Sequence, residues 1–161
     1  MNATGVSTQV VKRDQSHSGR PLQVFDDVIH VKLAGRVTGG QYSVVEDISA
    51  PRTGPPLHMH TREDESFYVV EGEYLFEIDG ERIVAKAGDF LFAARGTRHC
   101  FMNTGDTNAR MLVMAQPGGI DEFFEDLAQV QGSPAPEAVM PIFAKYGLEL
   151  LGPPMAHRQG A

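Results

Sequence analysis

A series of short β-prone runs separated by turn residues restricts the fold of this sequence more than any other feature. Between residues 22 and 116 such runs follow one another without a helical pattern, and Asp79-Gly80 separates two alternating segments, EYLFEI and ERIVAK. An Asp-Gly pair in this setting is a strong signal for a two-residue β-hairpin. The 17 glycines and 10 prolines among 161 residues supply the turns that many short strands need. The sequence therefore predicts an all-β sandwich or barrel.

The C-terminal part of the chain has a different pattern. In PGGIDEFFEDLAQVQG, apolar residues recur at helical spacing, and acidic residues occupy the first turn, where the helix dipole stabilises them. A second helix is predicted over residues 138–146, ending at Gly147. We expect Phe123 and Phe124 to pack the first helix onto the barrel, with a lid over a pocket as the alternative. The predicted organisation is a flexible N-terminal arm (1–20), a barrel (21–116), a C-terminal helical segment packed on the barrel (117–150) and a frayed tail (151–161).

Net charge and cysteine content restrict the classes of binding partner and the cellular compartment that we expect for this protein. The formal net charge of −7 argues against a nucleic-acid or anionic-membrane partner, because such binding depends on Lys and Arg neutralising phosphates. No apolar run approaches the roughly 18 residues of a membrane span, and the polar opening of the chain has no leader pattern. The single cysteine, Cys100, cannot form an internal disulfide. We therefore expect a cytoplasmic protein.

Two histidines open the most informative stretch, PPLHMHTREDESFYVVEG. His58 and His60 alternate with Met59, so their imidazoles share one face of an extended segment. Two neutral imidazoles and a carboxylate oxygen form a mixed nitrogen and oxygen set that suits Fe, Mn, Co, Ni, Cu or Zn. The stretch therefore predicts part of a metal site.

Three acidic residues in this stretch are candidates for the carboxylate ligand. Alternation places Glu65 on the same face as Phe67, and this apolar face is the better candidate for the barrel interior. Asp64 alternates to the opposite face, and Glu63 lies closer to the histidines. We favour Glu65 as the ligand and expect Glu63 and Asp64 to be solvated charges.

A fourth ligand should come from another strand. His99 stands three residues after Gly96, a predicted turn, at the head of the run HCFMN. Alternation places His99 on the same face as Phe101 and opposite Cys100, which we expect to be a buried, inert thiol. Closing a sheet brings distant strands together, so a site of three imidazoles and one carboxylate is geometrically feasible.

These residues resemble the two motifs of the cupin superfamily. The first motif is HxH, four residues, Glu, six residues and Gly, and the second is Gly, five residues, Pro-x-Gly, two residues, His, three residues and Asn. Eight positions of this chain match in register: His58, His60, Glu65, Gly72, Gly88, Gly96, His99 and Asn103. Arg52 stands where the first motif begins with glycine, and Ala94 replaces the proline of the second. The resemblance covers about residues 40–116.

The resemblance implies a double-stranded β-helix, or jelly-roll barrel, with a metal inside one mouth. One divalent transition metal per chain would be held by the residues that match the family's ligands, which are His58, His60, Glu65 and His99. The family is usually dimeric, so the resemblance also implies a homodimer.

Among cupins, this small single-barrel chain most resembles the quercetin 2,3-dioxygenase-like group. That likeness implies oxidative cleavage of a small aromatic or enolic compound, with Glu65 as a possible catalytic base. Phe67, Phe101 and either Phe76 or Leu75 would line the substrate pocket. Cupins with this ligand set also include isomerases, cyclases and non-catalytic binding proteins, because fold and ligands do not select a reaction. An isomerase or cyclase that uses no dioxygen and a metal-stabilised small-molecule binding module therefore remain alternatives.

Overall fold

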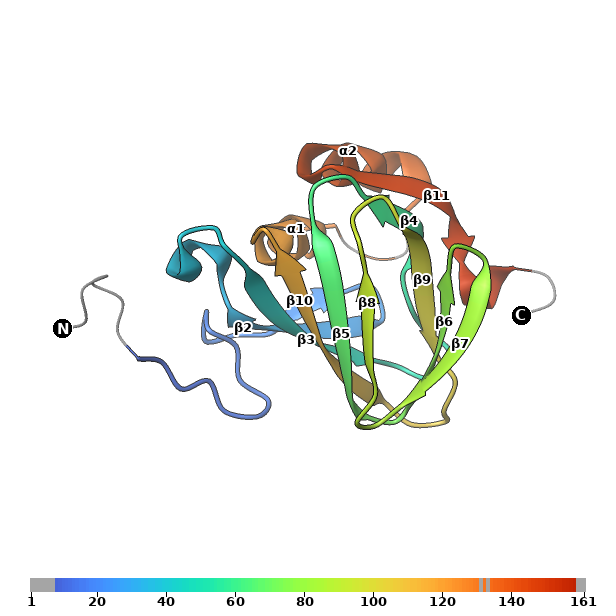
Figure 1. Ribbon diagram of the computed structural model, residues 1–161. Coiled ribbons are helices and arrows are strands. Elements are labelled where there is room, and N and C mark those ends of the chain that lie inside the picture. The colour runs from blue at the N-terminus through green and yellow to red at the C-terminus, as the bar shows by residue number, and fades with distance from the viewer. Residues whose placement is uncertain (1–7, 131, 133, 159–161) are drawn as a thin grey trace.

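The chain folds into a barrel made of two antiparallel β-sheets that face each other (Figure 1). The computed structural model describes residues 8–130, 132 and 134–158. The interior between the sheets is filled by side chains from both of them, which form one main hydrophobic cluster. This arrangement confirms the prediction of an all-β barrel.

Six strands form the first sheet. Inward and outward residues alternate along its central strand β5, where Glu65, Phe67 and Val69 are buried and Tyr68 is exposed. This period of two is the reason why the segment reads as a half-buried strand in the sequence. In spatial order the sheet contains β1 (Leu22–Val24), β2 (Asp27–Leu33), β3 (Ser43–Ser49), β10 (Ala109–Gln116), β5 (Asp64–Glu71) and β8 (Phe90–Ala93).

Five strands form the second sheet. In spatial order they are β11 (Leu148–Pro154), β4 (Pro56–His60), β9 (Arg98–Asn103), β6 (Glu73–Ile78) and β7 (Glu81–Lys86). Strands β6 and β7 form the predicted hairpin, in which Ile78 pairs with Glu81 across Asp79 and Gly80. Both turn residues have positive φ angles, 48° and 89°, as a two-residue hairpin turn of this hand requires.

Two helices and the last strand cover one mouth of the barrel (Figure 1). Helix α1 (Ile120–Leu127) and helix α2 (Pro136–Tyr146) follow β10, and β11 then returns to pair with β4. Phe123 of α1 and Phe143 of α2 are buried against each other, with ring centroids 5.1 Å apart. Packing of Phe123 against the barrel core, as predicted, is confirmed.

The predicted frayed tail is wrong for residues 151–157. Leu151 to Pro154 belong to β11, and a 3-10 helix, η2 (Met155–His157), buries Met155 against Cys100 and Met102. The glycine and two prolines in this stretch looked like a loop in the sequence. They are accommodated because β11 is an edge strand with two register shifts, at which ladder hydrogen bonds are interrupted. Residues 159–161 lie outside the described residues.

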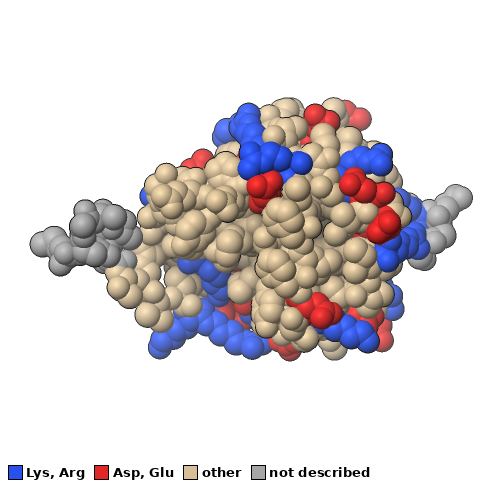
Figure 2. Space-filling view, viewed as in Figure 1, with Lys and Arg blue, Asp and Glu red and all other residues tan. Residues whose placement is uncertain are grey.

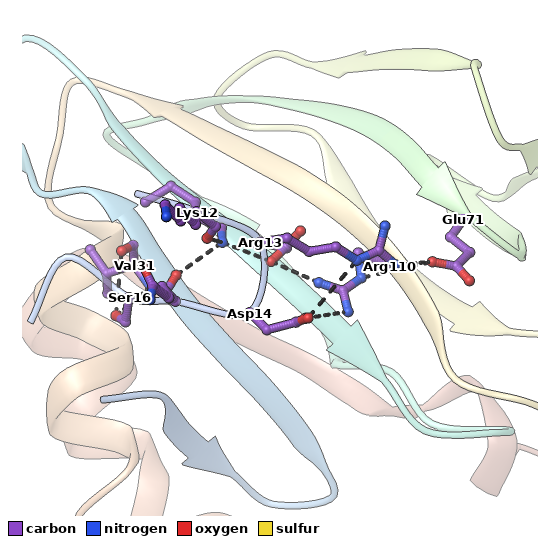
Figure 3. A network of polar contacts seen from close by, with 10 residues as sticks. Lys12, Arg13, Asp14, Ser16, Val31, Glu71 and Arg110 are labelled. Carbon is purple, nitrogen blue, oxygen red and sulfur yellow. Dashed lines mark hydrogen bonds and ion pairs between the residues drawn. The ribbon is translucent and has the colours of Figure 1, made fainter. Parts of the chain in front are cut away.

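The N-terminal arm is tied to the outer face of the six-stranded sheet (Figure 3). Arg13 contacts Glu71 and Asp14 contacts Arg110, each at 2.7 Å, and Ser16 accepts a hydrogen bond from the backbone of Val31. Residues 13–16 are therefore held against strands β2, β5 and β10, whereas residues 1–7 of the predicted flexible arm lie outside the described residues. A second 3-10 helix, η1 (Gly35–Thr38), connects β2 to β3. None of the helices described is long and apolar enough to cross a bilayer.

Candidate metal centre

Four side chains converge between the two sheets at the mouth covered by the helices. His58, His60 and His99 come from the five-stranded sheet, and Glu65 comes from the six-stranded sheet. One ligand atom from each residue can be chosen so that all four atoms lie within 4.8 Å of one another. The four predicted ligands are thus brought together in space.

Strand pairing explains how residues so far apart in sequence meet. His58 and His99 are direct partners in the antiparallel pair β4–β9, and their ring centroids are 4.5 Å apart. The rings of His60 and His99 are nearly parallel, with 8° between their planes and 5.6 Å between centroids. Glu65 stands on the facing sheet between Ala115 and Ala93, whose small side chains leave room for the imidazoles. The site therefore depends on both sheets closing in the observed register.

Each imidazole uses its outer nitrogen, Nδ1, for a contact that fixes the ring. Nδ1 of His58 lies 2.8 Å from the carbonyl oxygen of Pro56, and Nδ1 of His99 lies 3.1 Å from that of Thr97. Nδ1 of His60 lies 3.4 Å from Oε2 of Glu63. Because carbonyl and carboxylate oxygens are acceptors, each Nδ1 carries the proton, and Nε2 is the nitrogen directed to the centre.

The residues of the centre strongly shift one another's pKa values. Burial, followed by the neighbouring imidazoles, lowers the pKa of His58 to about 3, so this ring is neutral. Burial also opposes the charged form of His60, but Glu65 and Glu63 outweigh it and raise the pKa of His60 to about 10. Burial alone would raise the pKa of Glu65, yet His60 and His99 hold it well below its usual value. Glu65 is therefore an ionised carboxylate whose charge requires a cationic partner.

Two observations show that these residues suit a metal ion. Nε2 of His60 is buried and makes no contact of hydrogen-bond geometry among the described residues, so that its only close polar neighbour there is the ion-paired carboxylate of Glu65. Oε2 of Glu65 lies 2.9 Å from Nε2 of His99 and 3.3 Å from Nε2 of His60. Metal–ligand bonds of about 2.1 Å place neighbouring ligands roughly 3.0–3.5 Å apart. The donor set therefore suits a divalent transition metal, and the two distances from Oε2 of Glu65 are close to this spacing.

The turn that leads into β4 explains one departure from the motif. Arg52, at the position of the motif's glycine, has a φ of 62°, in the left-handed region that glycine adopts at least cost. Gly54, two residues later, approaches strand β9 so closely that an added Cβ would lie 1.9 Å from the carbonyl oxygen of Phe101. Position 54 of this turn therefore requires glycine, because no larger residue fits there.

Aromatic side chains enclose the centre on two sides. Below it, Phe67, Phe76 and Phe101 pack together in the barrel core, with ring centroids 5.2–6.1 Å apart. Above it, the edge of Phe143 faces His58, with 6.5 Å between the centroids. The four candidate ligands are at most 7% exposed. Phe67, Phe76 and Phe101 thus form a buried layer beneath the ligands, whereas Leu75 packs on the opposite side of its strand with Cys100.

The structure corrects one sequence prediction near the ligands. Glu63 is not a solvated charge: it is 7% exposed and contacts His60, because the β4–β5 turn brings its carboxylate to Nδ1 of the ring. Strand alternation could not reveal this, since residues 61–63 lie outside both strands. Asp64 is a surface charge as expected, paired with Arg95 at 2.9 Å. Cys100 is buried as expected, and burial raises the pKa of its thiol.

Comparisons with known proteins agree with this geometry. Residues 47–115 match the family model described as a cupin domain. The chain is 36% identical to the oxalate-binding protein of Thermotoga maritima over 64 residues, which cover 40% of this chain and 53% of that protein. It is 28% identical to quercetin 2,3-dioxygenase of Bacillus subtilis over 113 residues, which cover 70% of this chain and 33% of that protein. The chain thus spans about half or less of the length of these relatives.

A solved structure shows the same fold at low sequence identity. The crystal structure of a protein described as a predicted oxalate decarboxylase, also from Thermotoga maritima, superimposes with a TM-score of 0.62 at 23% identity. The match covers 68% of this chain and 99% of the other. This likeness confirms the predicted double-stranded β-helix. Residues 47–115 therefore match the cupin domain model, and the barrel that contains them has the fold of this solved structure.

Proposed function

We propose that this chain is a metal-dependent dioxygenase that acts on a small aromatic or enolic compound. The observation that carries the proposal is the buried set of three imidazoles and one carboxylate, each imidazole oriented by its outer nitrogen. One divalent transition metal per chain, among Fe, Mn, Co, Ni, Cu and Zn, suits this set. The similarity to quercetin 2,3-dioxygenase supports the same reaction class. We place the activity in the cytoplasm, where a free thiol such as Cys100 persists.

The chain's own residues have defined roles in this proposal. A metal held by four protein ligands can act as a Lewis acid or redox partner through its open positions. Glu65 presents Oε2 to His60 and His99, and we assign its other oxygen to accept a proton from the substrate. The buried layer of Phe67, Phe76 and Phe101 excludes water beneath the centre and favours a planar, apolar ligand.

A second candidate function is a metal-stabilised binding module without turnover. The closed mouth favours it, because Phe143 covers His58 and the ligands are almost fully buried. A small molecule can reach the centre only if helix α2 or the side chains beneath it move. An isomerase or cyclase that consumes no dioxygen needs the same access. The fold therefore does not distinguish these enzymes from a dioxygenase, and only the reaction that the protein catalyses does.

Metal analysis followed by oxygen uptake tests the proposal. Protein purified without chelator or histidine tag should hold about one transition metal per chain and should consume oxygen with a flavonol or a diketone. Stoichiometric metal without oxygen uptake across the panel would favour the binding module or the isomerase. A chain that holds no metal even after reconstitution would overturn the proposal.

We also propose that the chain forms a homodimer through the outer face of its six-stranded sheet. Phe90 and Phe92 on the edge strand β8 are 65% and 58% exposed, and Tyr68 and Met114 beside them are also exposed. Figure 2 shows a broad area without charged residues, with both signs of charge around it. Exposed apolar patches of this kind mark interaction sites.

The charges at the two ends of β5 favour a second copy as the partner. Asp64 pairs with Arg95 at one end, and Glu71 pairs with Arg13 at the other. Each end of the apolar face is thus bordered by an acid and a base that pair with each other, so two copies related by a two-fold axis near the middle of β5 could bury the face without opposing like net charges.

Light scattering tests the dimer. The wild-type chain should have twice the monomer mass, and Phe92→Glu should give monomers. Val84→Glu on β7, at a 55% exposed position of the other sheet, is the matched control and should remain dimeric. A wild-type monomer at tens of micromolar would contradict the assignment.

A further inference from the structure

The three imidazoles of the centre are not held in the same way. His58 and His99 each contact a backbone carbonyl two residues earlier in the chain, so that main-chain geometry fixes both rings. His60 instead faces a side chain, the carboxylate of Glu63. A carboxylate that accepts a hydrogen bond from a ligating histidine fixes its tautomer and makes it a stronger ligand. His60 is thus the ligand whose orientation and strength depend on another side chain.

Glu63 is built into this position. The β4–β5 turn that carries it is tied to the end of α2, because the backbone and the side chain of Thr61 both donate to the carbonyl oxygen of Gly147, at 2.8 and 2.7 Å. Gly147 has a φ of 76°, and an added Cβ would lie 2.7 Å from the side chain of Arg62. The turn therefore packs closely on α2, and Glu63 is held next to Nδ1 of His60.

The burial of Glu63 also places a second acid against His60. Within the part of the chain that the structure describes, His60 is the only basic side chain within 4.0 Å of this carboxylate. Two carboxylates, Glu63 and Glu65, thus flank one imidazole, with Glu63 at Nδ1 and Glu65 at Nε2. Burying an ionised carboxylate is costly unless it is paired. A cation bound at Nε2 of His60 would offset the charges of both acids.

We propose that Glu63 is a positioning residue that holds His60 with Nε2 directed at the metal and strengthens its bond to the ion. The assignment rests on the proposed metal site. It gives the residue a role outside the matched motif positions, since Glu63 falls among the four variable residues between His60 and Glu65.

Metal affinity of matched variants tests the assignment. Glu63→Gln keeps an acceptor oxygen without the charge, and Glu63→Ala removes both. We expect the affinity for Co²⁺, measured by competition with a chelator, to fall about 10-fold in Glu63→Gln and up to about 100-fold in Glu63→Ala. Glu149→Gln is the control, because Glu149 is an exposed acid on the neighbouring strand β11, opposite Met59. It should bind Co²⁺ like the wild type.

A spectroscopic readout separates positioning from a loss of folding. In the Co²⁺-loaded wild type, each of the three imidazoles should show one shifted, exchangeable Nδ1 proton. In Glu63→Ala one of these protons should exchange faster with water, while the other two stay as in the wild type. Unchanged affinity and unchanged exchange in Glu63→Ala would overturn the role of Glu63 alone. A wild-type chain that binds no Co²⁺ would remove the metal site, and with it both proposals.

Discussion

The two ends of the barrel both bury polar side chains, but only one end leaves them without partners. At the covered mouth, Nε2 of His60 has no hydrogen-bond partner among the described residues. At the opposite end, near Ser49 and Asn103, buried polar groups satisfy one another. Asn103 donates to the carbonyl oxygens of Ser49, Ala50 and Thr107, and it accepts a hydrogen bond from the backbone of Gly105.

The buried acidic residues at the two ends of the barrel also differ from each other. Asp47, near the opposite end, accepts a hydrogen bond from Ser49, which in turn contacts the hydroxyl of Tyr74. Burial, and then the nearby Asp27, raise the pKa of Asp47 well above its usual value, so that the surroundings favour the protonated form of this acid. Glu65 at the covered mouth stays ionised because imidazoles surround it. A buried carboxylate therefore marks a ligand site only where its neighbours keep it charged and leave lone pairs unused.

The largest effect should come from removing a ligand at the covered mouth. His99→Ala should reduce metal content from about one ion per chain to an undetectable level, because the remaining ligands lose an imidazole and the bond that orients Glu65. Elemental analysis of protein purified without chelator measures this. Full occupancy in the variant would show that His99 is not a ligand.

Metal removal should be the next largest effect. An ion that binds only the folded chain stabilises it by about 4 kcal/mol when its free concentration is 1,000 times the dissociation constant. Thermal unfolding with and without a chelator should therefore show a lower midpoint without metal. His99→Ala should show no such difference, and an equal shift in that variant would indicate that the chelator acts elsewhere.

Asn103→Ala should destabilise the opposite end without affecting the centre. The variant leaves three carbonyl oxygens and one backbone N–H without this partner, at 0% exposure of the side chain, and should cost about 2–4 kcal/mol of unfolding free energy. Denaturant titration measures the loss, and metal content should remain near the wild-type value. The exposed Asn108→Ala is the control. A loss of metal in folded Asn103→Ala would mean that the two ends are coupled.

The smallest effect concerns Asp27 and pH. Burial raises the pKa of Asp27 from 3.8 to about 6 in the folded protein. The folded state therefore binds the proton more tightly, so the stability that this group contributes is complete below about pH 4 and is lost as pH rises through 6. Asp27→Asn cannot ionise and should gain about 1–3 kcal/mol relative to the wild type between pH 4.5 and 8. Urea titrations at both pH values, with chelator present, check this. Parallel pH profiles of the two proteins would contradict it.

Local sequence patterns predicted the structure correctly where a single strand or a single turn determines it. Alternation correctly placed Glu65 and Phe67 inside, and the Asp79-Gly80 pair fixed the hairpin, because side chains in strands alternate and this turn needs two residues with positive φ. The helices were found by their periodicity, although α2 begins two residues earlier than predicted, at Pro136. The tail was misread because Gly152 and two prolines look like a loop, yet an edge strand tolerates them.

The sequence by itself predicted the strands and the hairpin, because each depends on residue type and short spacing, whereas the four candidate ligands were named from the resemblance to the cupin motifs. Only the tertiary structure decided that Glu63 is buried beside His60 and that Phe143 covers His58. It also decided that Asp47 lies inside the barrel, where burial raises its pKa. These outcomes depend on how the β4–β5 turn, helix α2 and the two sheets pack together. Contacts between segments up to about a hundred residues apart leave no periodic signal in either segment.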